Sequence, residues 1–150
     1  MDVIDREILA QLQIDGRISL TELARRVGLS VSPCHRRLRD LEASGAIRGY
    51  RAIVSPEALG LGFEALVFVT MRQEDRDTLL GFEAAVAEIP NVLLAQRLFG
   101  DPDYILRIVT VDLAAYQRLE DDMLSTLPGV QRLNSTLVMK RVVDERPLPA

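Results

Sequence analysis

The sequence predicts an α+β protein of two domains, a winged helix-turn-helix followed by a ferredoxin-like βαββαβ domain. Residues 1–50 carry three short helical patterns of apolar residues separated by turns. Residues 61–150 contain a strand–helix–strand pattern twice. The stretch between them, 51–60, is rich in turn-forming residues and is expected to be the linker.

Composition agrees with two folded domains. Of the 150 residues, 48% are hydrophobic and 27% are charged, which is enough for cores and for a hydrated surface. No apolar run approaches the roughly 18 residues that span a bilayer, and no basic-then-apolar leader is visible. The single cysteine, Cys34, excludes an internal disulfide. We therefore expect a cytoplasmic protein with no membrane partner.

The net charge of −4 hides an asymmetry. Residues 1–52 contain nine basic and seven acidic residues, whereas residues 53–150 contain nine basic and fifteen acidic ones. Within 36–51, five arginines face only two acids. A phosphate-binding surface needs local positive charge, so an acidic protein can still carry one. From charge alone, a solvated basic helix face is the simpler interpretation.

The first helix is predicted over residues 2–13. Ile4, Ile8 and Leu12 are spaced four apart, which places them on one face. Asp15-Gly16 is expected to end this helix in a turn.

Two further helices are predicted to follow. Ser19 stands three residues before Glu22, which is the capping-box pattern for a helix start, and Gly28 is the expected left-handed C-cap. Ser32-Pro33 suits an N-cap followed by proline at the first helical position. The segment IRGYRAIV (47–54) is predicted to be a strand, which would make the domain a winged variant. The inner face of the third helix would consist of Cys34, Leu38 and Leu41, which gives Cys34 a packing role and leaves a redox role open.

Such an arrangement is typical of DNA recognition. The second helix of a helix-turn-helix crosses the phosphate backbone, and the start of the third enters the major groove. Ser30, Ser32 and His35 lie near that start and are candidate contacts.

A family resemblance extends this interpretation. DGRIS (15–19), ELARRVGLS (22–30), SPCHRRLRDLE (32–42), SGAIRGYRA (44–52) and the proline that follows resemble the leucine-responsive regulatory protein/AsnC family. The resemblance implies that the arginines of the third helix sit on the DNA-reading helix. The expected contacts to double-stranded DNA are Ser30, Ser32, Pro33, His35, Arg36, Arg37, Arg39 and Arg48.

The second domain contains an internal repeat. AEIPNV (87–92) and STLPGV (125–130) each follow a helical pattern and open a strand. Two such units make one antiparallel sheet with both helices on one face. The expected elements are strand 63–72, helix 77–88, strand 92–99, strand 103–111, helix 113–126 and strand 130–142.

A sheet with helices on one side needs a cover for its other face. The predicted strands are too apolar to leave that face wet, so association of two copies through their sheets is expected. Two-fold symmetry would also let a helix-turn-helix read two half-sites. The resemblance implies the same, with homodimers that assemble into tetramers or octamers.

The loop FGDPDY (99–104) is the candidate effector site. By itself, Gly-Asp-Pro-Asp between two strands is ordinary turn chemistry. The resemblance implies that this domain, of the RAM or AsnC type, binds an amino-acid effector between subunits near this turn. The residues it assigns to the site are Gly100, Asp101, Asp103, Tyr104, Leu113, Ser135, Thr136 and Leu137.

No catalytic arrangement is visible. His35 is the only histidine, so one chain holds no histidine-based metal site or catalytic dyad, and no phosphate loop or nucleophile elbow is present. We expect no enzyme activity and no cofactor beyond the amino-acid effector. The sequence predicts a ligand-responsive, DNA-binding transcription regulator, and the resemblance implies that it controls amino-acid metabolism genes. The alternative is an effector-binding or oligomerisation module whose N-terminal helices bind protein.

Overall fold

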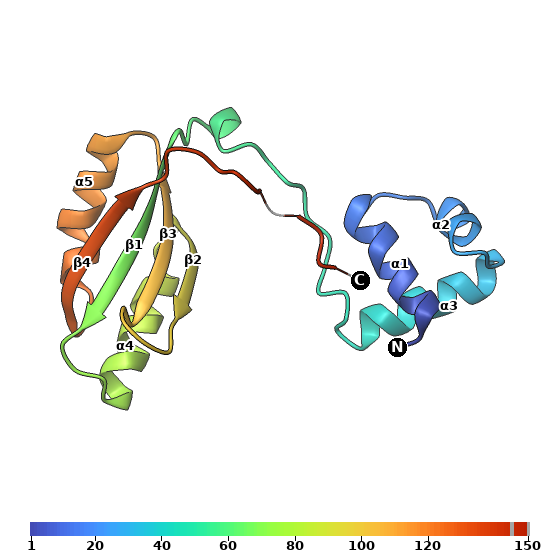
Figure 1. Cartoon of the computed structure of the whole chain (residues 1–150), viewed down its shortest axis with the longest axis horizontal. Coiled ribbons are helices and arrows are strands. Elements are labelled where there is room, and N and C mark those ends of the chain that lie inside the picture. Colours follow the sequence, from blue (N-terminus) through green and yellow to red (C-terminus); the bar gives the residue numbers. More distant parts are fainter. Residues whose placement is uncertain (145, 150) are drawn as a thin grey trace. The chain divides into compact units, whose positions relative to one another are not determined.

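The computed structural model describes residues 1–144 and 146–149 and divides them into two compact units (Figure 1). The first unit holds Met1–Ile53 and the described residues after Arg141, and the second holds Val54–Arg141. The last residues therefore group with the first unit and not with the expected range 61–150. Of the helices that the structure describes, none is both long and apolar enough to cross a bilayer.

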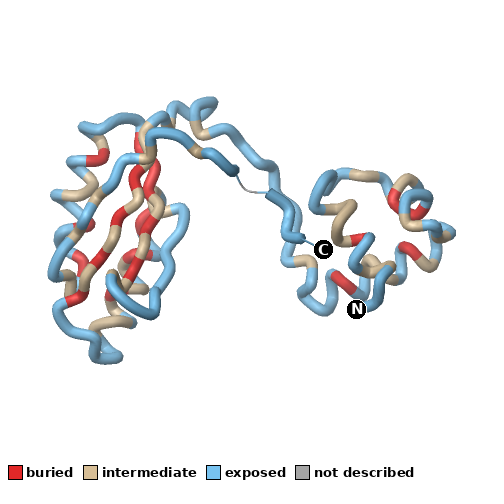
Figure 2. The backbone as a smooth tube through the Cα atoms, viewed as in Figure 1, coloured by how far each residue is buried: buried red, intermediate tan, exposed pale blue. Residues whose placement is uncertain are grey.

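The first unit is a three-helix domain with its own core. Its helices are α1 (Val3–Ile14), α2 (Leu20–Arg26) and α3 (Val31–Ala43). One buried cluster joins them: Ile8, Leu23, Ala24, Cys34 and Leu41 (Figure 2). Ser19 caps α2 through a bond from the Glu22 N–H of 3.2 Å, and Gly28 has the expected left-handed φ of 69°. The predicted helix-turn-helix is confirmed.

Two details of this domain differ from the sequence prediction. The N-cap of α3 is Ser30 and not Ser32, so Pro33 is the third helical residue. Proline is tolerated there because the N–H groups of a first helical turn have no partner within the helix. The segment 47–54 is not a strand, since the described residues offer it no ladder partner in this chain. An alternating apolar pattern forms a strand only when another strand pairs with it.

The second unit is the predicted ferredoxin-like sandwich. In chain order its main elements are β1 (Phe63–Met71), α4 (Arg76–Ala87), β2 (Val92–Arg97), β3 (Tyr104–Thr110), α5 (Leu113–Asp122) and β4 (Val130–Leu137), with short 3-10 turns at Glu57–Leu59 and Leu124–Thr126. The strands pair antiparallel in the order β2-β3-β1-β4. The C-terminal strand and helix are therefore shorter than the predicted 130–142 and 113–126.

The core of this unit lies between the sheet and its two helices. Alternate residues of β1 are fully buried, Val67 and Val69 among them, and they pack in one cluster with Phe82 of α4 and Tyr116 of α5. Since buried residues of β1 alternate with half-buried ones, both helices cover the same face of the sheet (Figures 1 and 2).

The two halves of the repeat close differently. Gly129 has a left-handed φ of 70°. Its counterpart in the first half, Asn91, does not, since every described residue with a positive φ is a glycine. A Cβ built on Gly129 would lie 2.2 Å from Cγ2 of Thr78 on α4. Position 129 therefore requires glycine for two reasons, namely the left-handed backbone and the close approach of α4.

Candidate DNA-binding helix and effector turn

Helix α3 presents a polar line on the side opposite its buried face. Cys34 and Leu41 are buried, whereas Ser32, Arg36 and Arg39 are exposed on the opposite face at spacings of four and three. His35 is exposed beside this line. The structure therefore brings these four predicted contacts together on one surface.

Arg37 lies elsewhere. Its Nη1 donates to Oδ2 of Asp2 and to Oδ1 of Asp5, each at 2.7 Å, and so ties α3 to the start of α1. Asp2 and Asp5 also form a reciprocal capping box of two 2.9 Å bonds. Each carboxylate accepts a backbone N–H and then the Arg37 guanidinium, and both contacts lower the pKa of these two carboxyl groups. Arg37 therefore ties α3 to the start of α1, and its contact with DNA stays a prediction.

We expect Arg37→Ala to lower the free energy of unfolding by about 1–2 kcal/mol, because two carboxylates lose a charge-assisted hydrogen bond. Urea denaturation followed by far-UV circular dichroism measures this change. Arg37→Lys should restore part of the loss. An alanine variant with unchanged stability but a reduced salt dependence of DNA binding would instead show that Arg37 contacts DNA.

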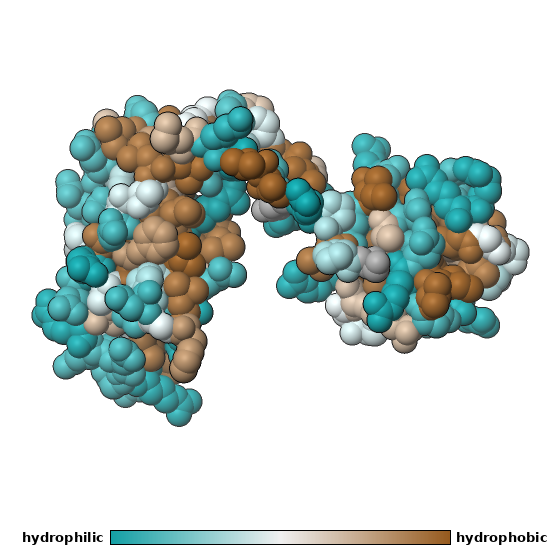
Figure 3. Space-filling model, viewed as in Figure 1, coloured by the Kyte–Doolittle hydropathy of each residue, from teal (hydrophilic) through white to brown (hydrophobic). Residues whose placement is uncertain are grey.

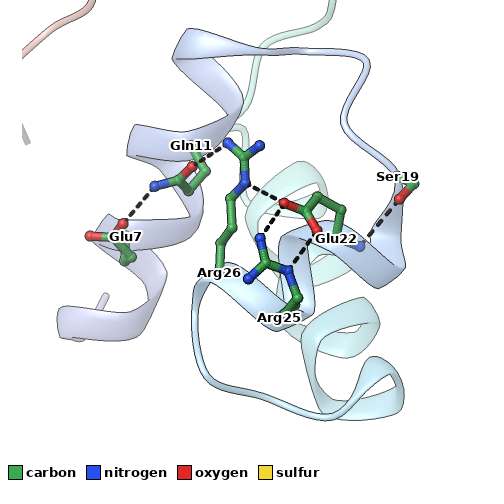
Figure 4. Close-up of polar contacts among 6 residues, drawn as sticks. All are labelled: Glu7, Gln11, Ser19, Glu22, Arg25 and Arg26. Atoms are coloured by element: carbon green, nitrogen blue, oxygen red, sulfur yellow. Dashed lines mark hydrogen bonds and ion pairs between the residues drawn. The ribbon is translucent and has the colours of Figure 1, made fainter.

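A second polar cluster joins α1 and α2 (Figure 4). Glu22 accepts hydrogen bonds from Arg25 and Arg26 at 2.7–2.8 Å, and Arg26 also donates to Gln11 at 3.0 Å. The two arginines, Arg25 first, lower the pKa of Glu22 to about 2. These arginines are therefore engaged within the domain.

The other predicted DNA contacts lie at or beyond the two ends of α3. Ser30 is the exposed N-cap of α3 with no side-chain cap bond, Pro33 is half-buried, and Arg48 is exposed beyond the end of α3. The thiol of Cys34 is buried, and this burial raises its pKa. A protonated, inaccessible thiol fits the packing role predicted for it.

The effector turn is held by Asp103. Its carboxylate Oδ2 accepts the backbone N–H of Met71 at 2.6 Å, and its own N–H donates to the carbonyl of Val69 at 2.9 Å. Its carbonyl accepts the N–H of Leu98 at 2.7 Å. Asp103 therefore joins the ends of β1, β2 and β3, while Gly100 and Asp101 remain exposed at the tip.

Tyr104 is also engaged in the fold. Its ring is buried against Phe82, and its hydroxyl donates to Oε1 of Glu83 on α4 at 2.8 Å. Arg97 donates to the same oxygen and to the Tyr104 hydroxyl, the latter at 3.1 Å. The bonds from Tyr104 and Arg97 lower the pKa of Glu83, and burial first of all raises the pKa of Tyr104.

The other predicted effector residues do not meet this turn within one chain. Ser135 lies on the helix side of β4, where its hydroxyl bonds that of Tyr116, and its neighbour Thr136 points to the opposite face. Leu137 is exposed farther along the same strand. Leu113 follows β3 and is therefore at the end of that strand remote from Tyr104. One chain alone does not assemble the site.

Sequence reasoning missed two groups of residues. The Asp2–Asp5 spacing is a visible capping-box signal, but nothing in the sequence indicates that Arg37 bonds it. Glu83 and Arg97 carry no motif, and only the packing of α4 on the sheet brings them to Tyr104.

Two family models match this chain, one over the helical N-terminal part and one over the part that contains the sheet. Residues 1–42 match the AsnC-type helix-turn-helix domain, and residues 64–148 match the Lrp/AsnC ligand binding domain. The leucine-responsive regulatory protein of Salmonella typhimurium is 40% identical over 142 residues, covering 95% of this chain and 87% of that protein. The proline dehydrogenase transcriptional activator of Rhodobacter capsulatus is 41% identical, covering 97% of this chain and 94% of that protein.

Two solved structures are similar over nearly the whole chain. A transcriptional regulator of Neisseria meningitidis in complex with L-Met has a TM-score of 0.94 at 38% identity, covering 99% of this chain and 96% of that one. An AsnC family transcriptional regulator of Agrobacterium tumefaciens has the same TM-score at 33% identity, covering 99% of this chain and 97% of that one.

Proposed function

The chain belongs to the Lrp/AsnC family of transcriptional regulators, and from this premise we propose that it controls amino-acid metabolism genes in response to an amino-acid-like effector. It is a regulator with a helix-turn-helix domain and a ligand-binding domain, and not an enzyme. We place it in the cytoplasm, because its relatives are bacterial regulators and a bacterial chromosome lies there.

The observation that carries the DNA-binding assignment is the outer line of α3. Ser32, Arg36 and Arg39 offer a hydroxyl and two guanidinium groups along one helix face, and Ser30 opens that helix. Short polar groups and arginines read base edges in a major groove and also neutralise phosphates. His35 and Arg48 extend this surface, whereas no observation favours a protein partner for the same helices.

Effector binding is proposed at the FGDPDY turn. Gly100 and Asp101 are exposed there, and the hydrogen bond from the Met71 N–H to the Asp103 carboxylate fixes the turn at the edge of the sheet. Leu113 and the segment 135–137 lie apart from the turn in one chain, so a site that uses all of them needs a second copy. The L-Met complex of the Neisseria relative supports an amino acid as the ligand class.

We also propose assembly into a homodimer, and then a tetramer or octamer, and the face of the sheet that lacks helices supports the dimer. Leu66 and Phe68 of β1 and Ile105 of β3 lie side by side on it, and Figure 3 shows apolar side chains gathered over the strands. Burying such a face contributes about 25 cal/mol per Å² of apolar area. A second copy places the same residues opposite themselves, as a two-fold interface requires.

A thermal-shift screen of the twenty amino acids tests the effector assignment, because a ligand that binds only the folded protein raises its melting temperature. Asp101→Asn should diminish the response to the active amino acid with little change in the melting temperature of the free protein, since Asp101 is exposed at the turn. Asp103→Asn should lower that melting temperature itself, because the carboxylate is bonded to Met71. An Asp101 variant with a full response would remove this turn from the site.

A further inference from the structure

The two residues that close the effector turn are both bonded to one carboxylate on α4. Arg97, the last residue of β2, and Tyr104, the first residue of β3, are register partners, and the turn 98–103 joins them. Tyr104 donates its hydroxyl to Oε1 of Glu83 at 2.8 Å. Nε of Arg97 donates to the same oxygen at 2.8 Å, and its Nη2 donates there as well. Both ends of the turn are therefore tied to α4 through a single oxygen atom.

The side chains of this cluster also hold one another. Arg97 donates to the Tyr104 hydroxyl at 3.1 Å, and its guanidinium carbon lies 5.8 Å from the centre of the Tyr104 ring. That ring packs on Phe82, the residue before Glu83 on α4, with 4.6 Å between the ring centres. A guanidinium that is bonded to a carboxylate and lies over an aromatic face has little freedom to rotate. The cluster therefore fixes the direction in which both strands enter the turn.

The tyrosine ring and the ion pair differ in burial. Tyr104 is 2% exposed, whereas the side chains of Glu83 and Arg97 are 38% and 50% exposed. Packing of the ring stabilises the domain, but an ion pair this exposed contributes little to the free energy of folding. Its effect on geometry is larger, because it decides where the two ends of the turn are held. Loss of the carboxylate should therefore disturb the turn more than it destabilises the fold.

We propose that Glu83 is a positioning residue of the effector site, which acts through Arg97 and Tyr104 and does not itself contact the effector. This role rests on the effector site proposed above at the turn 98–103. The Asp103 carboxylate fixes that turn to β1, and Glu83 fixes both of its ends to α4. Residues that are already held in place lose less conformational entropy when a ligand binds, so the carboxylate of Glu83 raises the affinity of the turn for its effector.

Glu83→Gln in the full-length protein tests this role, because it keeps the size of the side chain and removes its charge. The wild-type protein is first titrated by calorimetry with each of the twenty standard amino acids, and the tightest-binding one is the probe for the variants. We expect Glu83→Gln to bind that amino acid about fivefold more weakly, since charge-assisted hydrogen bonds become neutral ones. Its melting temperature without the amino acid should fall by a few degrees or less.

Two further variants make the comparison specific. Glu88→Gln makes the same change at the exposed C-cap of α4, outside this cluster, and should leave the affinity unchanged. The exchanged pair Glu83→Arg with Arg97→Glu again places a cation beside an anion. It should bind the amino acid more tightly than either of its single replacements, because the two sites are coupled.

Hydrogen exchange of the turn gives a readout that needs no effector. The Leu98 N–H is bonded to the carbonyl of Asp103 at 2.7 Å, and the Asp103 N–H is bonded to the carbonyl of Val69 at 2.9 Å. Both amides should exchange about fivefold faster in Glu83→Gln, since the ends of the turn open more easily. The strand segment 130–137, which this cluster does not touch, should exchange as in the wild type.

The outcomes separate this role from the effector assignment. A wild-type protein that binds none of the twenty amino acids overturns the effector site, and the positioning role with it. If the wild type binds, an unchanged affinity in Glu83→Gln or unchanged exchange at Leu98 and Asp103 overturns the positioning role and leaves the effector turn in place. A lowered melting temperature with full affinity would show a purely structural residue, and an equal loss of affinity in Glu88→Gln would show a general effect of charge; either result also overturns the proposal.

Discussion

Replacing Arg36 with alanine should weaken DNA binding about tenfold or more and reduce the slope of log K against log salt by about 1, and Arg39→Ala should act in the same way. Both guanidinium groups lie on the exposed line of α3, where they can reach phosphates or base edges. Losing a phosphate contact removes one released counterion from the binding equilibrium. Fluorescence anisotropy over a range of salt concentrations measures both quantities.

The DNA for this measurement is a fragment that the wild-type protein enriches from a random pool. Arg76→Ala removes the same charge from the ligand-binding domain and should change neither affinity nor slope. Arg37→Ala should lower stability yet retain the wild-type slope, since its guanidinium is bonded to Asp2 and Asp5. Equal binding by the Arg36, Arg39 and Arg76 variants would show that α3 does not contact DNA.

Gly129→Ala should lower the free energy of unfolding of the ligand-binding domain by about 3 kcal/mol. A left-handed conformation costs an alanine about 1–2 kcal/mol, and forcing a methyl group into a packed turn costs about 1–3 kcal/mol more. The added Cβ would lie 2.2 Å from Cγ2 of Thr78 and 3.0 Å from Cε of Met71. Denaturant unfolding followed by tyrosine fluorescence reports the change, because Tyr104 and Tyr116 are both buried in this domain.

Two further variants separate the causes. Gly60→Ala has a similar φ of +72° but open space around the new Cβ, so it should show the conformational cost alone. Thr78→Ser removes the methyl group in the way and keeps the hydroxyl that donates to Asp75, so it should recover part of the Gly129→Ala loss. A loss in Gly129→Ala no larger than that in Gly60→Ala would contradict the steric explanation.

Local signals predicted most of the fold. The apolar spacing of Ile4, Ile8 and Leu12, the Ser19 cap and the left-handed Gly28 each act within a few residues, and each is found as predicted. The repeat predicted the ferredoxin-like order of strands because its signals, too, lie within short stretches of the chain. The segment 47–54 was wrongly predicted as a strand because strand formation depends on a partner that the local pattern does not supply.

The site could be predicted only in part, since the role of a charged side chain depends on distant neighbours. Arg36 and Arg37 are adjacent in the sequence, yet a rotation of 100° per residue points one outward and the other to the carboxylates of α1. Likewise, the sequence identifies Asp103 only as a residue of a turn, and the folded sheet shows that its carboxylate accepts a hydrogen bond from the N–H of Met71. Helical periodicity could have separated Arg36 from Arg37, but not named the partners of Arg37.

The internal pairing of arginines shapes how the domain meets DNA. Glu22 pairs with Arg25 and Arg26, and Asp2 and Asp5 pair with Arg37, so the three positive and three negative charges of these two clusters sum to zero. Among the described residues, Arg36 and Arg39 form no such ion pair, so their two charges remain available on the exposed face of α3. Exposed charges steer a diffusing protein before contact, so we expect productive encounters with DNA to begin with this face of α3 turned toward the groove.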